Sequence, residues 1–144
     1  MRKFFIALFA VITVILFACN NNAPQGGTNS PLEGTSWKLT GLSALPNGLP
    51  TLSREVTIRL DTSRVAGFAG CNRYFGSYAT SGNALKFTGV ASTKMFCQGM
   101  MEVEDGLLQS INNTDAWHIN GTRLALLKGT DTLARFEASK AAEQ

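Results

Sequence analysis

The sequence has little of what most enzymes and metalloproteins use. It contains one histidine, His118, and three cysteines, and none of the C-x-x-C, H-E-x-x-H, G-x-S-x-G, Walker or G-x-G-x-x-G patterns occurs. Asp115 stands three residues before His118, but no nucleophile motif completes a hydrolase triad. We therefore expect a protein that is not an enzyme and that holds neither a metal ion nor a cofactor.

Charged side chains are also scarce, at 16% of the residues, with a formal net charge of +3. Removal of Arg2 and Lys3 with an N-terminal leader would leave eleven basic against ten acidic side chains. The basic residues are scattered singly, whereas a nucleic-acid-binding surface needs a dense Lys/Arg face. No nucleic-acid partner is expected.

The longest apolar segment lies at the N-terminus and is short for a membrane-spanning helix. Arg2 and Lys3 precede an apolar run from Phe4 to Ala18, and three asparagines follow Cys19. A spanning helix needs roughly 20 apolar residues. A short basic segment followed by an apolar one is typical of a cleaved export signal, here residues 1–18.

The junction Leu16-Phe17-Ala18-Cys19 resembles a lipobox. The resemblance implies cleavage before Cys19 and its modification with acyl chains such as palmitate; an ordinary secretory signal is the alternative. Each buried methylene contributes about 0.8 kcal/mol to membrane attachment. We expect a protein anchored in the cell envelope. In a Gram-negative cell, Asn20 after the cysteine resembles lipoproteins sent to the outer membrane, facing the periplasm.

Composition divides the rest of the chain into three parts. Residues 19–31 are rich in Asn, Gly, Pro and Ser and predict a flexible tether. Residues 32–138 are long enough for one domain with one core. Residues 139–144 are expected to be a disordered tail.

Alternating apolar side chains predict strands through most of the domain. Trp37 and Leu39 share one face, and Val56, Ile58 and Leu60 share another. The other predicted strands are Arg64–Gly70, Arg73–Thr80, Ala84–Val90, Ala116–Asn120, Arg123–Lys128 and Thr132–Ala138.

One segment, Gln98–Asn113, has a helical period instead. Met100, Val103, Leu107 and Ile111 recur at helical spacing and would form the apolar face of a helix. Glu104 is among the acidic residues that we place outside this face. A single helix in a run of about eight short strands lacks the βαβ rhythm of parallel sheets. We predict an α+β domain with a curved, mainly antiparallel sheet, forming a partly open barrel with one amphipathic helix.

Two motifs within this pattern are specific. The segment Val65–Tyr78 contains G-C-N-R-Y-F-G-S-Y, and Ala91–Cys97 reads A-S-T-K-M-F-C. Together with the opening Gly34–Leu39 and the late Leu124–Leu126, they resemble the META domain family, which includes HslJ-like bacterial proteins. The likeness covers residues 32–136.

The resemblance implies an α+β fold, no established enzymatic activity, and a link to heat shock, stress response and resistance to the hydrophobic antibiotic novobiocin. It supplies no catalytic residues. A structural likeness of the family to a lipid-binding pilot lipoprotein suggests binding of an envelope protein or an apolar ligand.

Cys71 and Cys97 are the cysteines that remain once Cys19 is acylated, in a compartment where thiols are oxidised. We predict a disulfide between them. A redox pair or metal site is the functional alternative, although His118 is distant in sequence. Two free, buried cysteines are the other alternative.

Weaker binding candidates flank these cysteines. Asn72 and Arg73 are polar residues between aromatic-rich segments, but a structural role is the preferred interpretation of both. Met95, Met100 and Met101 cluster with Phe96 near the start of the predicted helix, where core packing is expected and one or two side chains mark a contact site.

Two other binding functions compete with this one. A periplasmic inhibitor of a lysozyme or protease would use a rigid loop, for which Ser43–Pro50 is the candidate. A lipocalin-like carrier is suggested by Gly34 and Trp37, but the domain is short for a barrel with an open ligand cavity.

Overall fold

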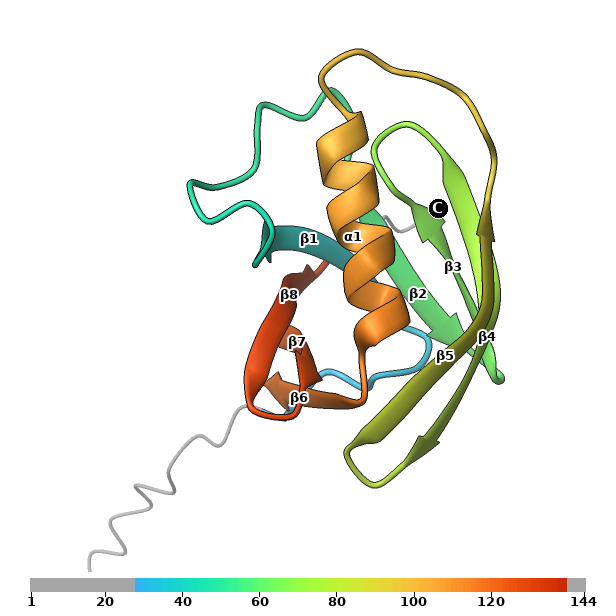
Figure 1. Ribbon diagram of the computed structural model, residues 1–144. Coiled ribbons are helices and arrows are strands. Elements are labelled where there is room, and N and C mark those ends of the chain that lie inside the picture. The colour runs from blue at the N-terminus through green and yellow to red at the C-terminus, as the bar shows by residue number, and fades with distance from the viewer. Residues whose placement is uncertain (1–27, 140–144) are drawn as a thin grey trace, which may run out of the picture.

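The computed structural model describes residues 28–139 (Figure 1). The predicted export signal, the lipidation site Cys19 and most of the predicted tether lie outside the described residues, as do residues 140–144. The chain is already held at Asn29, whose Oδ1 accepts a hydrogen bond from the Gly121 amide at 2.7 Å. Ser30 donates from its amide to the Gly121 carbonyl at 2.9 Å. The two bonds fix where the N-terminal segment meets the domain.

The elements follow the predicted alternation closely, with eight strands and one helix in the described part of the chain. They are β1 (Ser36–Leu42), β2 (Thr57–Asp61), β3 (Arg64–Phe68), β4 (Arg73–Ser81), β5 (Ala84–Ser92), α1 (Met101–Asn113), β6 (Ala116–Asn120), β7 (Arg123–Lys128) and β8 (Asp131–Ala138).

The eight strands form a closed antiparallel ring in which each strand pairs with its neighbour in sequence and β1 pairs with β8. The joint between β5 and β6 is the weakest, with Ala84 and Ala116 as its one residue pair. These strands diverge, and α1 lies across the opening between them (Figure 1). The ring is therefore not a regular barrel, and the predicted curved antiparallel sheet with one helix is confirmed.

Alternation along the strands decides which side chains fill the ring. On β4, Tyr74 and Tyr78 are buried, whereas Arg73, Phe75 and Ser77 are exposed. Burial of one large apolar side chain stabilises the fold by about 1.5–3 kcal/mol. The core is made of such inward-facing residues, among the largest of which are Trp37, Tyr74, Phe136, Leu39, Ile58, Leu107 and Leu126.

Two glycines allow the sheet to curve and its neighbours to approach closely. The Tyr74 ring crosses Gly67, and its hydroxyl donates to the Thr57 carbonyl at 2.8 Å, so a Cβ at residue 67 would collide with both. Gly76 lies opposite a bulge at Gly89 and Val90, where β5 has one extra residue. A Cβ at residue 76 would stand 3.0 Å from the Val90 Cα.

The helix begins three residues later than its sequence period predicts. Gly99 has a φ of +78°, which an α-helix does not accommodate, and the first helical residue is Met101. Gly106, in the middle of α1, lets the chain after β1 approach, since a Cβ there would lie 3.3 Å from both Ala44 and Leu42 side chains. Within residues 28–139, no helix has the length and apolar character required to cross a bilayer.

Candidate functional site

The segment between β5 and α1 is tied covalently to the sheet. Cys71, two residues before β4, forms a disulfide with Cys97, and their Cα atoms are 5.7 Å apart. This is the predicted pairing. We call residues 93–100, the loop that the disulfide holds, the tip.

One buried side chain fixes the backbone of the tip. Asn72 is 1% exposed, and its Oδ1 accepts hydrogen bonds from the Thr93 hydroxyl and the Met95 amide, both at 2.7 Å. Its Nδ2 donates to the Met95 carbonyl at 2.8 Å. Asn72 thereby bonds both polar groups of one tip peptide residue, as a neighbouring strand would.

The helix supplies the other half of this arrangement through Glu104, which is 3% exposed. Its Oε1 accepts from Asn72 Nδ2 at 2.8 Å, and its Oε2 accepts from the Asn72 amide at 2.9 Å. Two donor and two acceptor bonds use the full capacity of an asparagine amide. Asn72 therefore joins sheet, tip and helix, and no hydrogen-bonding group of its side chain is left for a ligand.

Glu104 was missed by the sequence analysis, which placed it on a polar face of the helix. It lies three residues before Leu107 and seven before Ile111, so helical geometry puts it on the buried face with them. The sequence alone shows that spacing. It does not show that Asn72 is the buried partner of Glu104, because the two residues are 32 positions apart.

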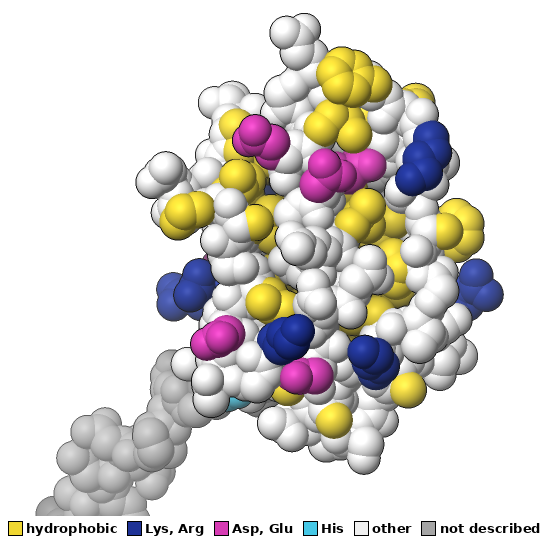
Figure 2. Space-filling model, in the orientation of Figure 1, with side chains coloured by type: hydrophobic (Ala, Val, Ile, Leu, Met, Phe, Trp, Pro, Cys, Tyr) yellow, Lys and Arg dark blue, Asp and Glu magenta, His cyan; other side chains and the backbone are white. Residues whose placement is uncertain are grey.

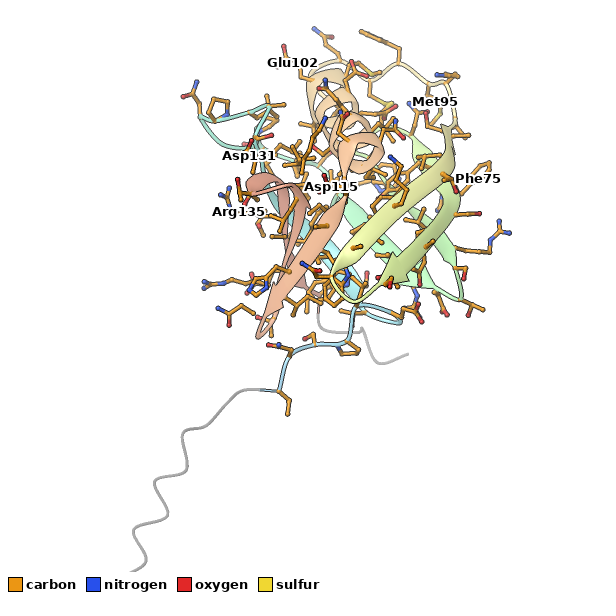
Figure 3. All side chains as sticks on the ribbon, turned by 60° about the horizontal axis from the view of Figure 1, so that its bottom comes forward. Phe75, Met95, Glu102, Asp115, Asp131 and Arg135 are labelled. Atoms are coloured by element: carbon orange, nitrogen blue, oxygen red, sulfur yellow. A yellow bond between two sulfur atoms is a disulfide. The ribbon has the colours of Figure 1, made fainter. Side chains whose placement is uncertain are left out.

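Apolar side chains project from the tip. Phe96 is 80% exposed and Met95 is 59% exposed, while Met100 and Met101 are half-buried and Met100 packs against the core. Figure 2 shows hydrophobic atoms at the upper end of the molecule, beside acidic side chains, and Figure 3 shows Met95 and Glu102 near this end. The apolar surface is thus next to the start of α1.

The remaining candidates are distributed over other parts of the fold. Arg73 is exposed on the outer face of β4. His118 is exposed on β6, whereas the Asp115 carboxylate accepts a hydrogen bond from the Gly129 amide at 2.8 Å and so supports the β7–β8 turn. Among residues 28–139, no three His, Cys, Asp or Glu side chains gather in a way that could hold a metal ion.

The loop predicted as an inhibitory element is partly fixed to the body of the domain. Leu45 and Leu49, within Ser43–Pro50, pack against the core, and Leu52 does so a little further on. The Gly48 amide donates to the Leu45 carbonyl at 3.0 Å, forming a turn. The loop therefore directs its two leucines inward, while Ala44, Pro46 and Pro50 are exposed.

Fold and tip together define a small disulfide-bonded α+β domain with a ring of antiparallel strands. The META domain family model matches residues 30–140, and the chain belongs to this family. The two motifs quoted above meet in the structure, since Asn72 of the first bonds Thr93 and Met95 of the second.

Two solved structures share the fold. A protein from Burkholderia xenovorans, determined by NMR, is 27% identical, with a TM-score of 0.60, over 76% of this chain and 84% of the other. A second protein, also determined by NMR, is 19% identical, with a TM-score of 0.57, over 72% of this chain and 88% of the other, and this likeness concerns the fold alone. No curated protein matches the chain significantly.

Proposed function

We propose that this protein is a non-enzymatic, lipid-anchored binding protein of the cell envelope, attached through Cys19, that acts through its tip in stress or antibiotic resistance. The N-terminal signal and lipobox pattern support the location. The disulfide between Cys71 and Cys97 supports it too, because such bonds persist in oxidising compartments.

The observation that carries the proposal is the exposure of Phe96 and Met95 on a loop whose backbone is fixed. Large apolar side chains on a mobile loop can turn inward, but here Asn72 and the disulfide hold the loop on the outside of the domain. A preorganised apolar group loses little conformational entropy when it binds. The tip is therefore suited to insert into a pocket.

The partner is an envelope protein with an apolar pocket and a basic rim. Glu102 and Asp105 are exposed in the first turns of α1, next to the tip, and they are complementary to basic residues. The same carboxylates are repelled by the anionic head groups of a membrane surface. Lys94 is the one basic side chain within the tip.

The position of the tip agrees with an anchored protein. Residues 29–30 bind Gly121 in the β6–β7 turn, which lies at the opposite end of the domain from the tip (Figure 1). A domain attached through a segment that enters at that turn directs the tip away from the membrane. It could then reach a partner in the space beyond.

Site-specific photo-crosslinking in the producing cell tests the role of the tip. A photoreactive residue at Phe96 should give a discrete protein adduct, which Met95→Asp should abolish while the fold is retained. The matched control carries the same residue at Lys128, exposed at the opposite end, and should give no such adduct. Identical adducts from both positions, or none from Phe96, would refute a contact through the tip.

Anchoring is tested separately with Cys19→Ser. The unaltered chain should incorporate labelled palmitate and fractionate with membranes, and the variant should do neither. A labelled or membrane-bound Cys19→Ser variant would contradict attachment at this residue.

A further inference from the structure

A shallow depression of about 620 Å³ lies on the outer face of β2, β3 and β4, and no residue of the tip lines it. Ala66, whose short side chain is exposed on β3, and Gly67 are among the residues that line it. Volumes of this order are common for small-molecule sites. The depression therefore has room for a ring-sized ligand.

Two guanidinium groups at this depression have no carboxylate partner. Within residues 28–139 the ion pairs are Lys38–Glu55, at 2.7 Å, and Arg59–Asp61, at 3.6 Å. Glu55, the one acidic residue that lines the depression, is paired with Lys38, and the lining residue Arg59 is paired with Asp61. Among the described residues, Arg54 and Arg73 are left without a carboxylate partner.

The aromatic ring of Phe68 brings these two arginines into one place. The Arg54 guanidinium carbon lies 4.2 Å from the centroid of the Phe68 ring, and Arg73 is the cross-strand partner of Phe68. Stacking on an aromatic face restricts a guanidinium while its N–H groups stay free to bind. A phosphate or carboxylate between the two arginines would receive charge-assisted hydrogen bonds from both sides.

Phe75 provides an apolar surface next to this charge. It lies two residues beyond Arg73 on the same face of β4, is 53% exposed, and points away from the sheet in Figure 3. Its cross-strand partners are Ala66 on β3 and Ala91 on β5, so small side chains leave its ring uncovered on both sides. A flat ring can pack here without displacing any part of the fold.

We propose that this depression binds a small aromatic anion, with its phosphate, sulfonate or carboxylate between Arg54 and Arg73 and its ring against Phe75. The site is distinct from the apolar tip and does not depend on the function proposed for it. It uses no residue that holds the disulfide or the Asn72 contacts.

The test is an NMR titration of the isotope-labelled full chain, in a non-ionic detergent, with 1-naphthyl phosphate. The amides of Ala66, Gly67 and Arg73 should shift in a saturable manner. Inorganic phosphate, which lacks the ring, and 1-naphthol, which lacks the charge, should each bind at least about tenfold more weakly, since about 1.4 kcal/mol is a factor of ten and one charge-assisted hydrogen bond contributes about that much.

Variants separate the two halves of the site. The double variant Arg54→Gln/Arg73→Gln should weaken binding of 1-naphthyl phosphate by at least about tenfold. Phe75→Ala should weaken binding of 1-naphthyl phosphate and leave that of inorganic phosphate unchanged. Arg64→Gln is the matched control, because Arg64 is exposed on β3 outside the depression, and it should leave the affinity unchanged.

The proposal is overturned if the titration shows no saturable shift, or if the shifts gather elsewhere on the ring. It is also overturned if Arg64→Gln weakens binding as much as the double variant, which would indicate a general effect of charge. Equal binding of 1-naphthol would indicate an apolar site without anion recognition.

Discussion

The two ends of this domain are held together in different ways. At the end formed by β6, β7 and β8, antiparallel strands follow one another through the turns at Gly121 and Gly129, and apolar side chains such as Leu124 and Leu126 are buried beneath them. At the other end the tip has one backbone bond to a strand, from the Thr93 amide to the Arg73 carbonyl at 3.0 Å, and is otherwise held by a disulfide and by Asn72. An irregular loop cannot satisfy its backbone groups through a ladder, so a buried polar side chain does so instead.

The two ends therefore differ in which side chains they can expose. At the end formed by β6, β7 and β8, few large side chains are exposed apart from those that strand alternation places on the outer face. The tip is held by hydrogen bonds of its backbone, by the disulfide and by Met100, so the exposed side chains of Met95 and Phe96 are not needed to hold it. Phe96 and Met95 can therefore face solvent, and we infer that the fold retains them for binding.

The largest effect is expected from removing the side chain that holds the tip. Asn72→Ala deletes four side-chain hydrogen bonds and leaves Glu104 with one partner, so the free energy of unfolding should fall by about 4 kcal/mol. Asn113→Ala is the control, because Asn113 is exposed and bonds only within its helix, and should change it by less than about 0.5 kcal/mol. Denaturant unfolding measures both. Similar values for the two variants would show that Asn72 is not the anchor.

Removal of the covalent tie should have a slightly smaller effect. The disulfide closes a segment with a sequence separation of 26 residues, and in the chain-entropy model its loss destabilises the fold by about 3.5 kcal/mol. The variant Cys71→Ala/Cys97→Ala should show this loss relative to the oxidised protein, whereas reducing agent should leave its stability unchanged. If the free energy of unfolding falls by less than about 1 kcal/mol, the hydrogen bonds alone hold the tip.

A core substitution at the hairpin end should separate global stability from the order of the tip. Leu126→Ala, at a fully buried site on β7, should lower the free energy of unfolding by about 3 kcal/mol. Because Leu126 lies on β7, which pairs with β6 and β8 and not with β4 or the tip, amide signals of the tip should remain as in the unaltered protein. Lys128→Ala, exposed on the same strand, is the control. Selective broadening of tip signals in Leu126→Ala would show that the two ends are coupled.

The smallest effect concerns alkaline pH. Burial, together with a hydrogen bond from the Tyr78 hydroxyl to Glu33, raises the pKa of Tyr78 to about 12 from its ordinary value of 10.0. The folded state thus holds this proton more tightly, and the resulting stabilisation is complete below pH 10 and is lost as the pH rises through about 12.

Tyr78→Phe should accordingly lose less stability than the unaltered protein between these two pH values. Tyr74, whose pKa burial also raises, is present in both proteins and contributes the same decline to each. Thermal unfolding across this range measures the difference. Parallel declines in the two proteins would contradict a raised pKa at Tyr78.

Much of the fold could be predicted because its strands are short, alternating and separated by turn residues. β6 and β7 have their predicted bounds, and the pairing of Cys71 with Cys97 was predicted because two cysteines remain once Cys19 is assigned to the lipobox and export is expected. The closure of β1 on β8 could not be predicted, because alternation shows which side chains face inward but not which distant strands pair.

The same limit applies to the sites. Asn72 and Glu104 each look like ordinary surface polar residues until the fold brings them together, and burial of a carboxyl group is rare enough to go against expectation. Arg59 and Arg73 are distant in the sequence, yet they lie on one face because β2, β3 and β4 are adjacent, and Arg54, in the loop before β2, joins them by stacking on Phe68 of β3. Only the register of the strands reveals that cluster.

The most direct test is the mobility of the tip itself, measured by ¹⁵N relaxation of the amides of residues 94–98 in the oxidised protein. A tip fixed by Asn72 should have order parameters near about 0.85, and Asn72→Ala should lower them below about 0.6 while the amides of β7 keep their values. Order parameters below about 0.6 in the unaltered protein would show that Met95 and Phe96 are not held in place, and would contradict the account.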